Sequence, residues 1–231
     1  MANAILMAAG LGTRMLPLTK NKPKPLIDIN GTPMIETVIS ALQTYNVKNI
    51  YIVVGYLKEQ FEYLKDKYSN INIVKNPDYL TVNNLSSIYY AKDYLKQDDC
   101  FICEADLYIS DKNIFNNSKQ SCYYGKMVEG YSEDWVFDLS EDGYITRVGK
   151  GGKDCYNMVG LSYFNKQDAE KLAEFIEKRY NTPGFETLFW DDVVNENLDS
   201  LKLIVNPVKK NQIIEIDTVE ELMKVRELQC I

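Results

Sequence analysis

The first 106 residues alternate short apolar runs with longer segments of helical periodicity. The runs predict buried strands, and they are AILMAAG (4–10), NIYIVVGY (49–56), NINIVKN (70–76) and CFICEAD (100–106). The segments between them, at 33–47, 58–68 and 83–96, predict helices. Strands that alternate with helices predict β-α-β units, which build a largely parallel sheet with helices on both faces.

After Asp106 the pattern changes to short strand-like stretches with glycine turns, at 121–131, 134–150 and 155–164. Helices are expected at 168–179 and 186–195, a late strand at 201–208 and a closing helix at 218–229. No linker or repeat interrupts the chain. We therefore predict one α/β domain over residues 1–231, a Rossmann-like three-layer sandwich. Its sheet is mixed but mostly parallel, with a small β-rich insertion after the fourth strand.

Composition excludes several classes of function. Histidine is absent, which removes Ser-His-Asp triads, Cys-His dyads and His-ligated zinc. The net charge of −7 argues against general nucleic-acid binding. No apolar run approaches the roughly 18 residues of a membrane-spanning helix. The start of the chain lacks the features of a signal peptide.

Five cysteines do not suggest a closed disulfide framework. Cys100 and Cys103 form a C-x-x-C, but in a strand residues three apart point to opposite faces, so these thiols should not share a metal. The cysteines suit a reducing compartment, and we expect a cytoplasmic protein. The sequence leaves the oligomeric state open.

The segment LMAAGLGTRMLPLTKNKPKPL (6–26), here called the glycine-proline loop, gathers basic residues at the start of an acidic chain. Gly10 and Gly12 begin a dinucleotide fingerprint, but Met15 replaces its third glycine. A G-x-x-x-x-G-K-[ST] run is also missing. A third type of loop is extended and wraps a nucleoside triphosphate with backbone N–H groups and basic side chains. A solvated basic loop beside an ordinary β-α turn remains the alternative.

The stretches AAGLGTR (8–14), PLT (17–19) and PKPL (23–26) resemble the signature of the sugar-phosphate nucleotidylyltransferase superfamily. The whole chain is most similar to the bacterial CTP:phosphocholine cytidylyltransferases in that superfamily. The resemblance implies that Arg14 and Lys24 hold the triphosphate and the attacking phosphate. It also implies a Mg²⁺ site at Asp106 and Asp217. Carboxylates that follow sheet strands suit this ion, although each aspartate alone could be a solvated turn residue.

The resemblance also supplies the expected binding residues. Asn84 and Ser87 lie three apart, on one face of a predicted helix, and could read the edge of the base. Capping of that helix by Asn83 or Asn84 is the alternative. The expected nucleotide contacts are Met7, Ala8, Ala9, Gly10, Gly12, Thr13, Arg14, Lys24, Asn84, Ser87 and Glu104.

For the acceptor, the resemblance places an aromatic cage at Trp135 and Phe189, with Asp191 beside it. A quaternary ammonium donates no N–H bond, so aromatic faces and carboxylates must hold it. The alternative is that both aromatic residues are simply core.

The expected reaction is transfer of CMP from CTP to phosphocholine, by in-line attack with Mg²⁺ and release of pyrophosphate. Arg14, Lys24 and Asp106 are the expected catalytic residues. The attacking phosphate is already anionic, so no general base is required, which suits a chain without histidine. Three alternatives stay open: 2-aminoethylphosphonate or phosphoethanolamine as acceptor, a hexose-1-phosphate nucleotidylyltransferase, and a non-catalytic nucleotide-binding module.

Overall fold

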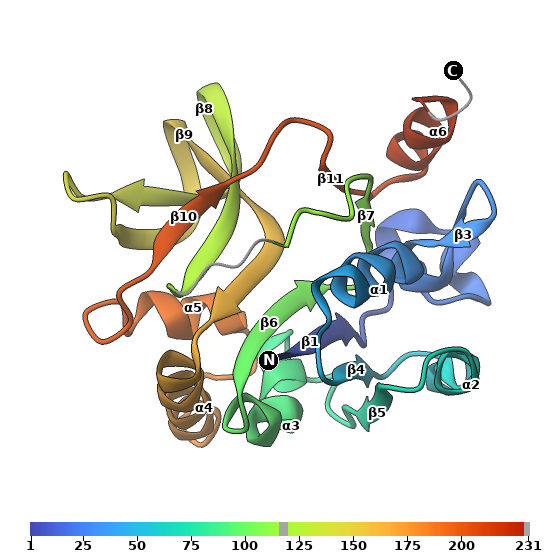
Figure 1. The fold of residues 1–231 in the computed structure, drawn as a ribbon, viewed down its shortest axis with the longest axis horizontal. Coiled ribbons are helices and arrows are strands. Elements are labelled where there is room, and N and C mark those ends of the chain that lie inside the picture. Colours follow the sequence, from blue (N-terminus) through green and yellow to red (C-terminus); the bar gives the residue numbers. More distant parts are fainter. Residues whose placement is uncertain (116–119, 229–231) are drawn as a thin grey trace.

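A seven-stranded sheet forms the centre of the protein, in a computed structural model that describes residues 1–115 and 120–228 (Figure 1). The strand order is β10-β8-β9-β6-β1-β4-β5. These strands are β1 (Ala2–Ala8), β4 (Ile50–Val54), β5 (Ile71–Lys75), β6 (Asp99–Glu104), β8 (Cys122–Leu139), β9 (Ile145–Phe164) and β10 (Ile204–Pro207). Strands β1, β4, β5 and β6 pair in parallel, as the apolar runs of the first 106 residues predict.

The β-rich part after Asp106 continues this sheet. Strand β9 pairs antiparallel with β6, matching Leu161 with Cys103 and Phe164 with Cys100. Strand β8 pairs antiparallel with β9, and β10 adds in parallel to the beginning of β8. The expected mixed, mostly parallel α/β fold is therefore confirmed, and its insertion extends the central sheet.

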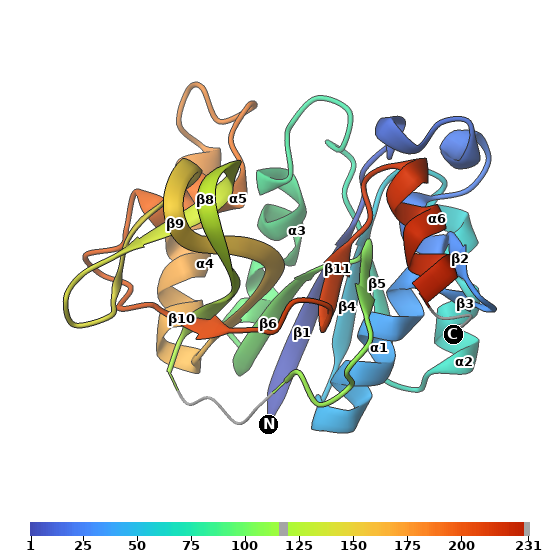
Figure 2. The same cartoon turned by 90° about the horizontal axis from the view of Figure 1, so that it is seen from above.

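Helices cover both faces of the sheet (Figure 2). Buried residues of α1 (Met34–Tyr45) and α2 (Tyr63–Lys67) share one core cluster with the sheet. Those of α3 (Leu85–Leu95), α4 (Lys166–Tyr180) and α5 (Trp190–Asn195) share the other. The helical spacing read in the α1 sequence is correct, because Ile35, Val38, Ile39 and Leu42 are all fully buried.

Two helix predictions were too long. The expected helix at 58–68 is a 3₁₀ turn at Lys58–Phe61 followed by the five-residue α2. The helix expected from Glu186 begins only at Trp190. The closing helix is α6 (Val219–Leu228), and Gln229 at its expected end lies outside the described residues.

Four short strands have no counterpart in the sequence pattern. Strands β2 (Asp28–Ile29) and β3 (Thr32–Pro33) form a hairpin before α1. Strand β7 (Leu107–Ile109) pairs antiparallel with β11 (Ile213–Glu215), so two segments far apart in the chain lie side by side. Strands of two or three residues are too short to show a period-2 pattern. The β7–β11 pair nevertheless positions the functional site.

The C-x-x-C thiols point to opposite faces of β6, as expected. Cys100 packs in the cluster of α3 and α4, and Cys103 packs in the cluster of α1. Burial raises the pKa of both thiols, so neither has the low pKa of a reactive or metal-binding cysteine. Within residues 1–115 and 120–228, no helix is both long and apolar enough to cross a membrane.

Candidate active site

A cavity of about 1090 Å³ opens at the carboxyl ends of β1 and β6. This is the place where open α/β sheets bind ligands. The glycine-proline loop, the start of α3, the β8–β9 arm, α5, β11 and α6 complete its wall. Every site residue expected from the sequence lines it: Met7, Ala8, Ala9, Gly10, Gly12, Thr13, Arg14, Lys24, Asn84, Ser87, Glu104, Asp106, Trp135, Phe189, Asp191 and Asp217.

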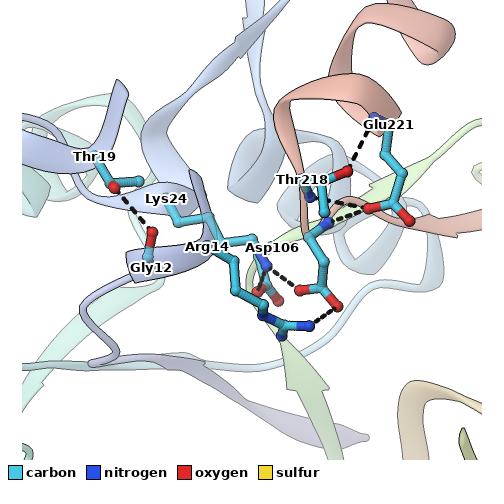
Figure 3. Close-up of polar contacts among 8 residues, drawn as sticks. Gly12, Arg14, Thr19, Lys24, Asp106, Thr218 and Glu221 are labelled. Atoms are coloured by element: carbon cyan, nitrogen blue, oxygen red, sulfur yellow. Dashed lines mark hydrogen bonds and ion pairs between the residues drawn. The ribbon is translucent and has the colours of Figure 1, made fainter. Parts of the chain in front are cut away.

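The glycine-proline loop folds back on itself beside this cavity. Gly12 has a φ of +63°, and a Cβ there would lie 2.9 Å from the Cβ of Lys24. The Thr19 hydroxyl donates to the Gly12 carbonyl at 2.8 Å and closes the fold of the loop (Figure 3). Gly10 differs, because a Cβ there would meet no atom within 4 Å. Its backbone is therefore open to close approach by a ligand.

Lys24 joins the two aspartates that the sequence singles out. Its Nζ lies 2.5 Å from Asp106 Oδ2 and 2.6 Å from Asp217 Oδ1. Burial alone would lower the pKa of Lys24, but the two carboxylates outweigh it and raise that pKa. Arg14 Nη1 lies 2.7 Å from Asp217 Oδ2. Figure 3 shows the Lys24 side chain reaching Asp106 from the loop.

Asp217 is held in place by local hydrogen bonds as well as by strand pairing. Pairing of Leu107 with Glu215 sets β11 beside β7, directly after Asp106. The backbone N–H groups of Asp217 and Thr218 donate to Glu221 Oε2 at 2.8 and 2.9 Å. The Glu221 N–H donates to the Thr218 hydroxyl at 3.2 Å. This reciprocal arrangement is a capping box, and it fixes the turn that leads from Asp217 into α6.

The donor set fits a magnesium site. Asp106 and Asp217 converge on one point, where the Lys24 ammonium stands as a cation. Although burial would raise the pKa of Asp217, Lys24 and Arg14 lower it, so this carboxyl stays ionised. Within the described residues, no group of three or more acidic or cysteine side chains has the arrangement of a metal site. Two carboxylates suit Mg²⁺, which takes its other ligands from phosphates and water.

A second group of carboxyls lines the same cavity. Burial raises the pKa of Glu104 well above its usual range, and the nearby Glu215 and Asp106 add to the shift. Burial also raises the pKa of Asp191 to about 7, although the Tyr123 hydroxyl donates to it at 2.9 Å. The pKa of Glu215 is raised too, because the surrounding protein partly removes its carboxyl from water. The negative charges of Asp106 and Asp217 add to this shift. Crowded acidic groups of this kind favour a bound cation.

Trp135 and Phe189 line the same cavity. Their ring centroids are 5.4 Å apart with an interplanar angle of 66°, which is direct edge-to-face contact. The two rings therefore form a corner, and no ligand fits between them. Both are half-buried and line the cavity, whereas Trp190 is fully packed against Tyr123 and Phe164. Trp135 also packs against the core cluster of α3 and α4, so lining the cavity and packing on the core are compatible for this residue.

The start of α3 brings Asn84 and Ser87 to the cavity wall. Asn84 is the N-cap residue, yet its side chain makes no bond to its own helix. Its Oδ1 accepts the backbone N–H of Trp190 at 3.0 Å and so ties α3 to α5. The capping alternative is therefore wrong for the Asn84 side chain. The Ser87 hydroxyl is buried and accepts a bond from Asn76.

Sequence reasoning missed several residues of the cavity wall, including Glu215, Asn76, Lys126 and Lys150. Glu215 carried a usable signal, since it lies two residues before Asp217 and strand neighbours at that spacing share a face. Asn76 follows β5 without any motif, and only the tertiary structure places it behind Ser87.

Comparison with known proteins agrees with this geometry. A family model for the MobA-like NTP transferase domain matches residues 4–125, which contain the glycine-proline loop, Asn84, Ser87 and Asp106. The chain belongs to the MobA-like NTP transferase family. It is a nucleotidyltransferase, because its curated relatives over nearly the whole chain are enzymes of that class. The non-catalytic alternative is thereby set aside.

Three relatives of this NTP transferase narrow the comparison. A 2-aminoethylphosphonate cytidylyltransferase of Lancefieldella rimae is 58% identical over 221 residues, covering 95% of this chain and 90% of that protein. A choline-phosphate cytidylyltransferase of Streptococcus pneumoniae is 37% identical and covers 97% of each. A solved CTP:phosphocholine cytidylyltransferase from Streptococcus pneumoniae superposes with a TM-score of 0.91 at 36% identity, covering 99% of each chain. The expected choline acceptor is thus not confirmed over aminoethylphosphonate.

Proposed function

We propose that this nucleotidyltransferase transfers CMP from CTP to 2-aminoethylphosphonate and releases pyrophosphate. One observation carries the proposal: a single cavity joins a basic, glycine-lined end to an acidic, aromatic end. Arg14 and Lys24 suit the phosphates at the first end. Asp191 and Glu104 suit an ammonium group at the second. An acceptor with an anionic head and a cationic tail matches this distribution of charge.

The chemistry requires little from the protein beyond position and charge. A phosphonate oxygen attacks the α-phosphorus of CTP in line, a new P–O bond forms, and the bond to pyrophosphate breaks. The attacking oxygen is already anionic, so no proton has to be removed. Lys24 stabilises the charge that develops on the α-phosphate, and Arg14 stabilises the leaving pyrophosphate. Placement of reactants and preorganised charge then account for the rate.

Asp106 and Asp217 would hold the magnesium ion. When bound, the ion would supply positive charge to the phosphate oxygens. Lys24 bonds both of these carboxylates in the structure and would share them with the ion. The site therefore has two parts. Asp106 and Asp217 would hold the magnesium ion, and Arg14 and Lys24 would bind the phosphates.

Two observations favour 2-aminoethylphosphonate over phosphocholine. The relative that carries its name is 58% identical, against 37% for the choline-phosphate enzyme. A primary ammonium also donates N–H bonds, which carboxyls such as Asp191 and Glu104 can accept. Phosphocholine is the second candidate because Trp135 and Phe189 offer the aromatic faces that a quaternary ammonium prefers.

The test is a pyrophosphate-release assay in which each nucleoside triphosphate is crossed with four acceptors. These are 2-aminoethylphosphonate, phosphocholine, phosphoethanolamine and glucose 1-phosphate. We expect the highest kcat/KM for CTP with 2-aminoethylphosphonate. A higher value with phosphocholine would transfer the proposal to the second candidate. Turnover only with glucose 1-phosphate, or with a nucleotide other than CTP, would refute it.

A further inference from the structure

We propose that Asn76 sets the preference for cytosine over uracil by fixing the direction in which the Ser87 hydroxyl donates its proton. Asn76 does not act on the base itself, so it is a positioning residue that works through Ser87. The inference rests on the proposed use of CTP. It assigns the choice of base to a buried side chain of the cavity wall that bonds Ser87.

The orientation of the Asn76 amide is fixed by its surroundings. Its side chain is only 2% exposed, and its Oδ1 accepts the backbone N–H of Asp78 at 2.9 Å. A backbone N–H can only donate, so the amide oxygen must face Asp78. The amide nitrogen must therefore face the other way, toward α3.

Two serine hydroxyls meet that nitrogen. Asn76 Nδ2 donates to Ser86 Oγ at 2.8 Å and to Ser87 Oγ at 3.2 Å. Both hydroxyls are thus acceptors on this side, and each still has one proton to donate. Ser86 donates its proton to the Asn83 carbonyl at 2.8 Å. Its hydrogen bonds are then complete within the protein.

Ser87 remains without an acceptor for its proton among the residues that the structure describes. Its side chain is only 4% exposed, yet it lines the cavity. A buried hydroxyl proton without an acceptor costs free energy, so a ligand atom that accepts it is favoured. Since Asn76 already donates to Ser87, the proton must be directed away from Asn76. The accepting atom must then come from the cavity side.

This arrangement separates the two pyrimidines. N3 of cytosine is an unprotonated acceptor, whereas N3 of uracil carries a hydrogen and donates. Because the Ser87 hydroxyl donates its proton on the cavity side, it pairs with N3 of cytosine. With uracil, the N3–H of the base and the Ser87 hydroxyl would both be donors facing each other. The serine proton would then have no acceptor. Discrimination of about tenfold or more follows from the known cost of such an unpaired buried group.

The Asn76→Asp variant tests the inference directly. An ionised carboxylate at this position would accept from the Asp78 N–H and from Ser87, so the Ser87 proton would turn away from the cavity. The serine lone pairs would then face the base and accept the N3–H of uracil. We expect the ratio of kcat/KM for CTP to that for UTP to fall by about tenfold or more, measured between pH 7 and 8.5. Dissociation constants for CMP and UMP should shift in the same sense.

Further variants separate positioning from general damage. Asn76→Ala frees the Ser87 hydroxyl to rotate, and Ser87→Ala removes it, so both should lower the CTP-to-UTP ratio. Ser86→Ala is the matched control, because the Ser86 proton is already used by Asn83, and it should keep the wild-type ratio. A purely structural role for Asn76 would lower activity with both nucleotides equally and leave the ratio unchanged. That result in both Asn76 variants would overturn the inference.

Failure of the proposed function has a different signature. If the wild-type protein shows no preference for CTP over UTP, the proposed specificity for CTP is refuted, and no variant is needed to show this. If the wild-type protein prefers CTP and Ser87→Ala keeps that preference, the proposed function stands and the role of the Asn76–Ser87 pair falls.

Discussion

At the scale of single residues, burial distinguishes Lys24 from the other lysines of the glycine-proline loop. Lys24 is 6% exposed and bonds both Asp106 and Asp217, whereas Lys20 and Lys22 are exposed. The loop therefore holds one ammonium in a fixed position and leaves two in solvent. This matches the expectation from the sequence that Lys20 and Lys22 are solvated.

Replacement of Lys24 by alanine should lower kcat by roughly 10²–10³, the typical loss when one preorganised charge-stabilising group is removed. Lys22→Ala, in the same loop but exposed, should stay within about twofold of wild type. Steady-state pyrophosphate release measures both, and circular dichroism checks that both variants fold. Near-wild-type turnover of Lys24→Ala would contradict the catalytic role proposed for this residue.

Replacement of Trp135 by alanine should discriminate between the two acceptor types. Loss of the aromatic face should raise KM for phosphocholine by about tenfold, and that for 2-aminoethylphosphonate by less, because a primary ammonium can still bond the carboxyls. Steady-state kinetics with both acceptors supply the comparison. Equal losses with the two acceptors would show that Trp135 acts through packing alone.

At the scale of elements, α2 is joined to α1 through one buried carboxylate. Glu36, in the first turn of α1, accepts hydrogen bonds from the hydroxyls of Tyr63 and Tyr68 and from Lys67. Burial would raise the pKa of Glu36, but these three donors outweigh it and lower that pKa. A five-residue helix has little stability of its own, so this contact holds α2 in place together with the burial of Leu64 in the core.

The lowered pKa of Glu36 predicts a pH dependence of stability. Because the carboxyl has a lower pKa in the folded protein than the ordinary 4.5, its contribution is complete above pH 4.5 and is lost as the pH falls below it. Glu36→Gln should therefore lower the free energy of unfolding by about 1–3 kcal/mol at neutral pH. Urea unfolding at several pH values should show this difference shrinking as the solution is made more acidic. A difference that grows on acidification would contradict the assignment.

At the scale of the whole molecule, the end of the chain closes over its beginning. Leu222 and Val225 of α6 pack in one cluster with Met15, Ile27 and Met34. The same helix begins just after Asp217, so its packing positions the aspartate and the glycine-proline loop together. Figure 2 shows α6 lying beside the N-terminal part of the chain.

A substitution that leaves an empty space between α6 and the N-terminal residues should therefore affect both stability and nucleotide binding. Leu222 is fully buried, and Leu222→Ala should lower the free energy of unfolding by about 2–5 kcal/mol and raise KM for CTP. Met223, the next residue on α6, is 50% exposed, and Met223→Ala should change stability by less than about 0.5 kcal/mol. Thermal unfolding and kinetics of the pair supply the measurements. Equal effects of the two substitutions would contradict this account of α6.

The sequence by itself determined the features that depend on neighbouring residues. Apolar runs and helical spacing predicted the parallel strands and α1. The glycines, prolines and basic residues of the first loop predicted a loop that lines a ligand cavity, because backbone freedom and charge belong to those residues wherever the loop lies. Cys100 and Cys103 were correctly placed on opposite faces because strand geometry is local.

Only the tertiary structure decided which distant groups meet. Lys24 and Asp217 are 193 positions apart, and they meet because the short strands β7 and β11 pair, which no periodic pattern announces. Asn76 acquires its role only when α3 lies against the end of β5, so that one amide faces two serines. A hydrogen bond depends on distance and direction in space, and sequence patterns record neither for residues far apart in the chain.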